Sequence, residues 1–451
     1  MDVRPIFNRP FSLLVMSARW SNWAGEQVCA PQRIARPRSE SELQEIVAQA
    51  AAEGLKVRAV GAGHSFTDCA CTDGVMLDLS GMERVISVDR QLAQVTVEGG
   101  ARLYKLGPLL AAEGLALENQ GDIDRQSITG AISTATHGTG IKLRNLSAQI
   151  RALRIVTASG EVIEVSADSE GQDLENYLAA RVSLGALGII SRVTIQCVPL
   201  YTLHRQDRPL PLAQTLDQLD EHVDGNDHFE FFTFPYTQVA LTRSTSRSLS
   251  EPRQLTPPWK RYVEEELLEN RLLGLLCRTG RRAPRLVPHI NRTIAAALSA
   301  SEVEDRAYKV YATNRAVRFT EMEYAIPRQH ARAAVQQIME LVPRRALPIL
   351  FPLEVRFAAA DEAFLSTAYG RETCYIAVHQ YHGMEFETFF RACEVIFNTY
   401  DGRPHWGKRH YQSASSLRER YPDWQRFVTV RDRFDPERVF ANDYTRRVLG
   451  E

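Results

Sequence analysis

The sequence predicts an α+β fold with two domains. A length of 451 residues favours two to three domains, and a composition of 44% hydrophobic and 24% charged residues is ordinary for a globular protein. Short β-branched runs alternate with helical segments over residues 20–198, which favours an α+β nucleotide-binding half over a doubly wound sheet. Renewed strand patterns with helices between them fill residues 199–451. We place the boundary near Pro199.

The first half opens with a predicted helix. Ser39 and Glu42 have the spacing of a capping box, and apolar residues at helical spacing follow them. A second helix is predicted over residues 103–113. Strands are predicted wherever β-branched residues gather between turn residues. These strands cover residues 57–60, 75–79, 85–88, 95–98, 152–157, 162–165 and 189–198.

The second half predicts an antiparallel sheet covered by helices, which would serve as a cap over a ligand site. Its predicted strands cover residues 229–234, 317–324, 349–357 and 373–380, and a helix is predicted over residues 329–341. Between them, residues 252–288 are rich in arginine and proline. Residues 259–271 and the stretch after them look helical, with little amphipathic order. We favour a peripheral helical pair there over a mobile lid.

Charge and cysteine usage exclude several classes of function. A net charge of −1 gives no basic field for nucleic acid, so a polyanionic partner is not expected. The seven cysteines are scattered and odd in number, which indicates free thiols in a reducing compartment. Cys69 and Cys71 lack a second pair at zinc spacing, so no metal site is expected.

No segment of the sequence predicts a membrane anchor. Residues 11–16 are too short for the apolar core of a signal peptide and lack a small-residue cleavage site behind them. No run approaches the roughly 20 apolar residues that span a bilayer. We therefore expect a cytoplasmic protein that associates with a membrane at most peripherally.

A glycine turn follows the predicted strand at residues 57–60. Gly61, Ala62 and Gly63 let the chain turn sharply and bring bare backbone amides close to a ligand, for which a phosphate is the natural acceptor. The turn fits neither common nucleotide fingerprint, so by itself it is equally compatible with an ordinary turn. His64 is the unusual residue, because a phosphate cradle needs no imidazole. It suggests a nucleophile or an attachment point.

A second glycine-rich stretch covers residues 119–140. It holds small and hydroxylated residues and few bulky apolar ones, so it cannot fill a core by itself. The hydroxyl groups that could meet phosphate oxygens and ring edges belong to Ser127, Ser133, Thr134 and Thr136. A long surface loop is the alternative. Two such loops, each after β-rich sequence, favour a shared cofactor cleft.

Several motifs in this order carry a family resemblance. They are Gly61-Ala62-Gly63-His64-Ser65 followed by Cys71-Thr72-Asp73-Gly74, then Thr136-His137-Gly138-Thr139-Gly140, Leu184-Gly185-Ala186-Leu187-Gly188, Glu354-Val355-Arg356-Phe357 and His405-Trp406-Gly407-Lys408. The chain resembles the aldonolactone oxidoreductases, which are the gulonolactone, arabinonolactone and galactonolactone oxidases or dehydrogenases. These are FAD enzymes of the vanillyl-alcohol-oxidase (VAO/PCMH) type. The resemblance runs from about Trp20 to the C-terminus and is strongest to the bacterial gulonolactone dehydrogenase type.

The resemblance implies a fold, a cofactor and a reaction. It implies an FAD-binding domain at residues 20–198 and an antiparallel-sheet cap domain at residues 199–451, with residues 400–451 returning to the flavin. The implied reaction oxidises the C2 alcohol of L-gulono-1,4-lactone or D-arabinono-1,4-lactone to an ascorbate-type product. The implied FAD-binding residues are Gly61, Ala62, Gly63, His64, Ser65, Gly121, Asp122, Ser127, Gly130, Ser133, Thr134, Thr136, His137, Gly138, Gly188 and Ile189.

Three residues are candidates for the chemistry. Glu354 and Arg356 lie two apart on a predicted strand, so their side chains leave the same face. An uncharged run precedes them, which favours a buried pair over a solvated one. By resemblance they form the substrate-site pair, with Arg356 also able to stabilise negative charge on the reduced flavin. Lys408 resembles the second active-site cation: with a pKa lowered by burial and by Arg356 it could accept the proton, and with a charged ammonium it could orient the hydroxyl.

Further expectations concern the flavin and its surroundings. In the family, a histidine at the position of His64 is bonded to the flavin 8α-methyl carbon, so we expect one covalent bond; packing near the ring is the alternative. In enzymes of this type the position of Gly121 lies over the flavin, where a small residue leaves oxygen a path, so Gly121 favours an oxidase. Because the bacterial enzymes that the chain resembles are dehydrogenases, we expect slow formation of hydrogen peroxide, with a cytochrome or dye as the better electron acceptor. His379 could touch sugar hydroxyls or be an ordinary sheet residue. Other open alternatives are an FAD oxidoreductase for another sugar or alditol, and a non-catalytic flavin-binding protein.

Overall fold

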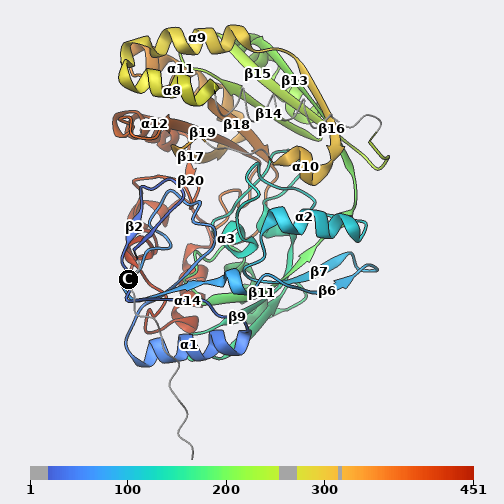
Figure 1. Cartoon of the computed structure of the whole chain (residues 1–451), viewed down its shortest axis with the longest axis vertical. Helices are drawn as coiled ribbons and strands as arrows, with labels where there is room; N and C mark the ends of the chain where they lie inside the picture. The colour runs from blue at the N-terminus through green and yellow to red at the C-terminus, as the bar shows by residue number, and fades with distance from the viewer. Residues whose placement is uncertain (1–18, 253–271, 313–316) are drawn as a thin grey trace, which may run out of the picture.

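The structure is a computed structural model that describes residues 19–252, 272–312 and 317–451. It has an upper and a lower half, and each half combines β-sheet with its own helices (Figure 1). The predicted helix at residues 259–271 and the apolar stretch at residues 11–16 lie outside the described residues.

The lower half of Figure 1 holds a three-stranded and a five-stranded sheet. The parallel sheet has the order β3 (Arg33–Ala35), β5 (Val75–Asp78), β4 (Val57–Val60). The antiparallel sheet has the order β10 (Val162–Ser166), β9 (Ile150–Val156), β11 (Ile189–Gln196), β7 (Gln94–Glu98), β6 (Val85–Asp89). The helices that residues 19–198 contribute to the lower half are α1 (Glu40–Ala52), α2 (Leu103–Ala112), α3 (Ile128–Ser133) and α4 (Gly171–Ala180).

The predicted elements of this half are confirmed with one correction. Ser39 caps α1 by accepting a hydrogen bond from the Glu42 amide at 3.2 Å, and the Glu42 carboxylate accepts one from the Arg38 amide at 2.8 Å. The strand predicted over residues 189–198 is present as β11 but is shorter than predicted. It ends at Gln196, and the separate strand β12 (Val198–Pro199) pairs with β8 (Leu115–Ala116) instead.

The upper half of Figure 1 is one antiparallel sheet of eight strands. Its order is β16 (Ser301–Arg306), β13 (Thr202–Pro211), β15 (Val239–Ser248), β14 (His228–Thr233), β18 (Leu353–Ala358), β19 (Thr373–Tyr381), β17 (Phe319–Pro327), β20 (Arg403–Pro404). Its helices are α5 (Leu212–Asp217), α6 (Leu219–Gly225), α8 (Leu273–Arg282), α9 (Val287–Ala297), α10 (Ala307–Tyr311), α11 (Ala331–Arg344) and α12 (Glu387–Thr399).

Two predictions for this half need correction. The strand predicted from residue 349 begins only at Leu353, because Pro352 has no amide to donate to a neighbouring strand. The arginine-rich region was expected to have little amphipathic order, yet its described helix α8 is amphipathic. Within this helix Cys277 is buried, whereas Arg278 and Arg282 are exposed.

The two faces of the eight-stranded sheet differ sharply in polarity. Side chains alternate between the faces of a strand, so odd and even positions have different surroundings. Phe231, Val355 and Ile376 belong to an apolar core that includes side chains of α11 and α12. The alternate positions of the same strands carry Glu230, Arg356 and other charged side chains that are nonetheless buried. The sheet therefore presents a buried charged face on the side away from those helices.

The C-terminal segment returns to the lower half. Helices α14 (Trp424–Phe434) and α15 (Asp443–Leu449) contribute to the same apolar core as β9 and β11. The Val57 amide donates to the Val439 carbonyl at 2.9 Å, and the Phe66 amide donates to the Gly407 carbonyl at 2.7 Å. These bonds bring the last part of the sequence beside the first glycine turn.

Two further features are the state of the cysteines and the character of the helices. All seven cysteines are free thiols, as the sequence predicts. Within the described ranges, every helix is too short or too polar to cross a lipid bilayer.

Candidate active site

The first glycine turn lies against the start of α3. A Cβ atom added at Gly61 would lie 2.2 Å from the Ser127 Oγ atom, so only glycine allows this approach. Ser127 is the N-cap residue of α3 and accepts a hydrogen bond from the Gly130 amide at 3.2 Å. Gly63 has a φ of +68°, which glycine adopts without strain. The two predicted loops therefore meet face to face.

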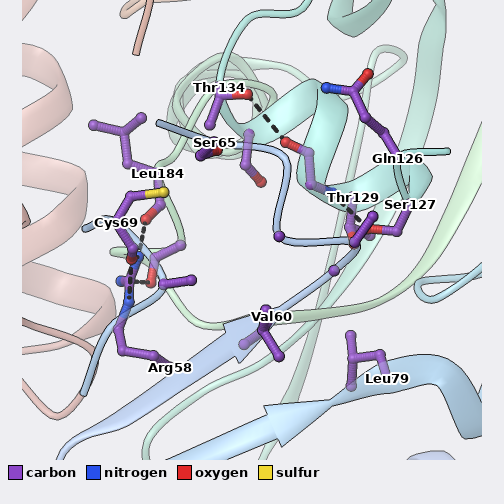
Figure 2. Close-up of a pocket in the computed structure, with 18 of the residues that line it drawn as sticks. Arg58, Val60, Ser65, Cys69, Leu79, Gln126, Ser127, Thr129, Thr134 and Leu184 are labelled. Atoms are coloured by element: carbon purple, nitrogen blue, oxygen red, sulfur yellow. Dashed lines mark hydrogen bonds between the residues drawn. The ribbon is translucent and has the colours of Figure 1, made fainter. Parts of the chain in front are cut away.

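Where they meet, they line a cavity, which we call the long cavity (Figure 2). It combines backbone of the glycine turn with hydroxyl groups of the second loop, which suits an extended cofactor with phosphates. The sequence-predicted residues that line it are Gly61, Ala62, Gly63, His64, Ser65, Ser127, Gly130, Ser133, Thr134, Gly188 and Ile189. Gln126 and Thr129 also line it and were not singled out from the sequence.

Arg58 is a further lining residue that sequence reasoning missed. Its guanidinium donates to the carbonyls of Cys69 at 2.9 Å and Leu184 at 2.8 Å (Figure 2), and to that of Phe440 at 2.8 Å. It thus ties together three segments around one end of the cavity. An arginine inside the β-branched run of β4 was the signal, because a charge there must be buried with partners.

A second cavity lies on the charged face of the sheet. Residues from both halves of the chain line it: Gly121, Asp122, Ile123, Gln126, Thr136, His137, Phe319, Glu321, Glu323, Glu354, Arg356, His405 and Lys408. The structure thus brings the three candidate catalytic residues together with four of the predicted cofactor residues. A smaller cavity lined by Lys408, His405 and His64 lies beside it. Because His64 also lines the long cavity, it lies where the long cavity and this smaller cavity meet.

Arg356 is held by three carboxylates. Its Nε donates to Glu230 Oε2 at 2.8 Å, and its Nη2 forms ion pairs with Glu354 and, at 3.4 Å, with Asp122. Burial alone would lower the pKa of Arg356, but Glu354, Asp122 and Glu230 raise it well above its ordinary value. Arg356 is therefore a permanent cation at the edge of the cavity.

The surroundings of Lys408 bear on the two alternatives left open above. Burial would lower its pKa, but the carboxylates of Glu321 and Glu323 raise it above the ordinary value, and its Nζ is ion-paired with Glu321. The raised pKa favours the alternative of a charged ammonium over that of a pKa lowered by burial and by Arg356. The sequence did not reveal the two neighbouring carboxylates. A charged Lys408 can donate hydrogen bonds.

Glu321 and Glu323 line the charged cavity and are candidate site residues that sequence reasoning missed. Burial would raise their pKa values, but Lys408 lowers that of Glu321 and His137 lowers that of Glu323. Both lie on β17 two positions apart, on the face that also carries Glu354. The same alternation that singled out Glu354 and Arg356 was present there and would have found them.

His137, Glu323 and His405 form a group of metal-ligand type, with candidate atoms within 4.8 Å of one another. Hydrogen bonds account for this arrangement. His137 Nε2 lies 3.1 Å from Glu323 Oε1, and His137 Nδ1 donates to the Gly138 carbonyl at 2.9 Å. The Gly407 amide donates to His405 Nδ1 at 3.0 Å. Lys408 would also repel a metal cation, so we assign none.

The remaining predicted residues have distinct surroundings. His379 is not among the residues that line the charged cavity. Its Nδ1 donates to the Pro352 carbonyl at 3.1 Å, and its Nε2 lies 3.5 Å from Glu321 Oε1. Gly138 lines a third cavity on the other side of Arg356. Trp406 packs in the apolar core and donates to the Leu365 carbonyl at 2.7 Å.

His64 is half-buried beside Trp23, with ring centres 5.5 Å apart. Burial, followed by the positive charge of Lys408, lowers the pKa of His64 to about 4. The imidazole is therefore neutral near pH 7, which leaves a nitrogen lone pair available.

Comparison with known proteins agrees with this geometry. A family model described as D-arabinono-1,4-lactone oxidase matches residues 193–448, and one described as FAD binding domain matches residues 31–166. The chain is 65% identical over 435 residues to the L-gulono-1,4-lactone dehydrogenase of Mycobacterium tuberculosis, covering 96% of this chain and 100% of that protein. It is 33% identical to the L-gulonolactone oxidase of Mus musculus, with 96% and 98% covered. It is 29% identical to an alditol oxidase of a Streptomyces species, with 96% and 100% covered.

Among solved structures, a cholesterol oxidase from B. sterolicum superposes with a TM-score of 0.84, covering 99% of this chain and 100% of that one. The two sequences are only 16% identical, so this likeness concerns the fold alone. It confirms the fold class predicted from the sequence.

The close approach at Gly61 gives a test of the long cavity. We expect Gly61→Ala to lower the amount of flavin that copurifies, because the new methyl group would collide with Ser127 and separate the two loops. The ratio of flavin to protein absorbance measures this. Gly225→Ala is the matched control, since a Cβ there meets no atom within 4 Å. Adding Ser127→Gly to Gly61→Ala removes the collision and should restore part of the flavin; a full flavin content in Gly61→Ala alone would contradict this account.

Proposed function

The chain belongs to the D-arabinono-1,4-lactone oxidase family of FAD-dependent oxidoreductases, and from that premise we propose that it oxidises the C2 alcohol of a sugar 1,4-lactone. L-gulono-1,4-lactone and D-arabinono-1,4-lactone are the proposed substrates, and the product is of the ascorbate type. The observation that best supports this is the link between the two cavities: the smaller cavity shares His64 with the long cavity, and it shares His405 and Lys408 with the charged cavity.

We assign FAD to the long cavity. The glycine turn and the hydroxyl groups of the second loop suit the phosphates, and a Cβ at Gly61 would collide with Ser127, where the two loops that line the site meet. FAD supplies a hydride acceptor when bound. Residues around the charged cavity, including Gly121, Asp122, Thr136 and His137, would then lie near the ring system.

The lactone would bind between the two cations. A sugar lactone is neutral and rich in oxygen acceptors, so Arg356 and Lys408 can donate to its carbonyl and hydroxyl groups without losing their own protons. Arg356 also brings positive charge into the cavity, which would balance negative charge on reduced FAD. These roles extend those proposed from the sequence.

A carboxylate must then take the hydroxyl proton, because Lys408 holds its own. Glu321 is ion-paired with Lys408, and Glu323 with His137, and both have lowered pKa values that make them weak bases. Glu354 shares its partner Arg356 with Glu230 and Asp122. We therefore assign proton removal to Glu354. His379, close to Glu321, would influence the substrate only through its neighbours.

We further propose one covalent bond between a His64 nitrogen and the flavin 8α-methyl carbon. The position of His64 at the junction of the cavities and its neutral imidazole both support this. The electron acceptor is the remaining element of the proposal. Gly121 lines the charged cavity, where the lack of a side chain would favour access of oxygen, yet we propose a cytochrome or dye as the better acceptor. A cytoplasmic location, with at most peripheral membrane contact, belongs to the same proposal.

The substrate class can be tested on the purified holoenzyme. Under anaerobic conditions, L-gulono-1,4-lactone and D-arabinono-1,4-lactone should bleach the visible flavin absorbance, whereas an alditol such as xylitol should do so more slowly. With the best lactone, turnover should be faster with cytochrome c or a dye than with oxygen alone, which yields hydrogen peroxide. If the alditol bleached the flavin and the lactones did not, the protein would be an alditol oxidoreductase and the lactone proposal would be overturned. Equal rates with every acceptor would overturn the acceptor proposal.

The assigned roles predict separate effects on turnover and flavin content. Glu354→Gln removes the proton acceptor and should lower kcat by about 10²–10⁴-fold, a range typical of general bases. Lys408→Ala and Arg356→Ala should also lower turnover far more than they lower flavin retention. Val395→Ala, on an exposed part of α12, is the control. Near-normal turnover in both the Lys408 and the Arg356 variant would remove them from the site.

The covalent bond has a direct test. After denaturing gel electrophoresis, the wild-type band should fluoresce yellow under ultraviolet light, because the flavin stays attached to the chain. His64→Ala should give a non-fluorescent band of equal protein amount. If the wild-type flavin is released by denaturation, His64 contacts the ring without bonding to it.

A further inference from the structure

Behind Arg356, opposite charges alternate across four neighbouring strands. Arg356 on β18 lies directly across from Glu230 on β14, Glu230 lies across from Arg243 on β15, and Arg243 lies across from Asp207 on β13. We call these four residues the charge row. It runs from the charged cavity towards the far edge of the eight-stranded sheet.

Each link of the charge row is a hydrogen-bonded ion pair. Arg356 Nε donates to Glu230 Oε2 at 2.8 Å, and Arg243 Nη1 donates to Glu230 Oε1 at 3.0 Å. Arg243 also donates two hydrogen bonds to the Asp207 carboxylate, from Nε at 2.9 Å and from Nη2 at 3.1 Å. The side chains are only 8–18% exposed, so solvent screens these charges little.

Glu230 has two oxygens, and the row gives each a different partner. Oε1 is taken by Arg243, so Glu230 offers only Oε2 to Arg356. A carboxylate with both oxygens available prefers to bind a guanidinium through two parallel bonds. Such a fork on Glu230 would draw one of the Arg356 Nη groups away from its present neighbours.

Those neighbours line the cavity in which the substrate is proposed to bind. Arg356 Nη2 faces Glu354 and Asp122, and both of these residues line the charged cavity. Glu230 and Arg243 line the third cavity, on the other side of Arg356. The orientation of the Arg356 guanidinium therefore depends on which oxygens of Glu230 are already occupied.

We propose that Arg243 and Asp207 are positioning residues for the oxidation, because they hold Glu230 so that it binds Arg356 through Nε alone and leaves the Nη groups facing the cavity. Neither residue is among those lining the charged cavity, so both act through Arg356. The inference rests on the proposed function for the role of Arg356 in the reaction.

Arg243→Met is the decisive variant, since it removes the charge and keeps an extended side chain. We expect the rate constant of flavin reduction by lactone, measured by anaerobic stopped flow, to fall about 10- to 100-fold, as for other small misplacements of a reacting group. KM and flavin content should change much less. Arg243→Lys keeps the charge and should recover part of the rate.

Arg247→Met is the matched control. Arg247 lies on the same strand and the same face and is also half-buried, but it contacts His228 and the Glu118 carbonyl instead of the charge row. Its replacement should leave the reduction rate close to wild type. If both variants lowered the rate constant of flavin reduction equally, the loss would reflect the removal of any arginine from β15, and the proposal would be overturned.

A double-variant cycle separates positioning from general weakening of the sheet. If Arg243 acts through Arg356, Arg356→Lys should slow reduction strongly in the wild type and only slightly when Arg243→Met is already present. Independent, multiplying effects would overturn the proposal. The proposed function fails in a different way, namely when no lactone reduces the wild-type flavin. Any compound that does reduce it can then serve for this cycle.

Discussion

The buried charged face of the eight-stranded sheet is the constraint on which the rest of the structure depends. A charge that leaves water must find partners in the protein, or its cost exceeds what folding can supply. Here Glu321, Glu354 and Arg356 lie on the same face that covers the lower half of the molecule. Their mutual pairing fixes each side chain, so stability and the preparation of the site arise from the same contacts. The apolar opposite face, packed on α11 and α12, holds the sheet in place.

The lower half solves a complementary problem with backbone instead of charge. The glycine turn lies so close to Ser127 that no larger residue fits, and Arg58 draws three separate segments together through their carbonyls. The result is a long cavity with a polar lining that ends at His64. The sheet above then supplies the charged groups that the lower half lacks. Neither half contains the whole site.

Much of this could be read from the sequence, because it depends on local pattern. Alternation with a period of two placed Glu354 and Arg356 on one face, and glycine spacing found both loops. What could not be read depends on which strands become neighbours. Apart from Glu354, the partners of Arg356 and Lys408 lie 87 to 234 positions away in the sequence, so Glu230 and Glu321 were not recognised and the charge state of Lys408 could not be decided. Strand ends were also imprecise where Pro352 and Cys197 interrupt pairing.

The return of the C-terminal segment has a consequence for how the protein is made. Arg58 bonds the Phe440 carbonyl across 382 positions of sequence, and Asn442 donates to the carbonyls of Asp68 and Cys71. During synthesis on the ribosome, the first loops emerge long before these partners exist. Closing such distant contacts is slow, because the loop entropy must be overcome before any contact stabilises the chain. The contacts around the cavity can thus be completed only after residues 440–442 have left the ribosome, and FAD meets its complete binding site only then.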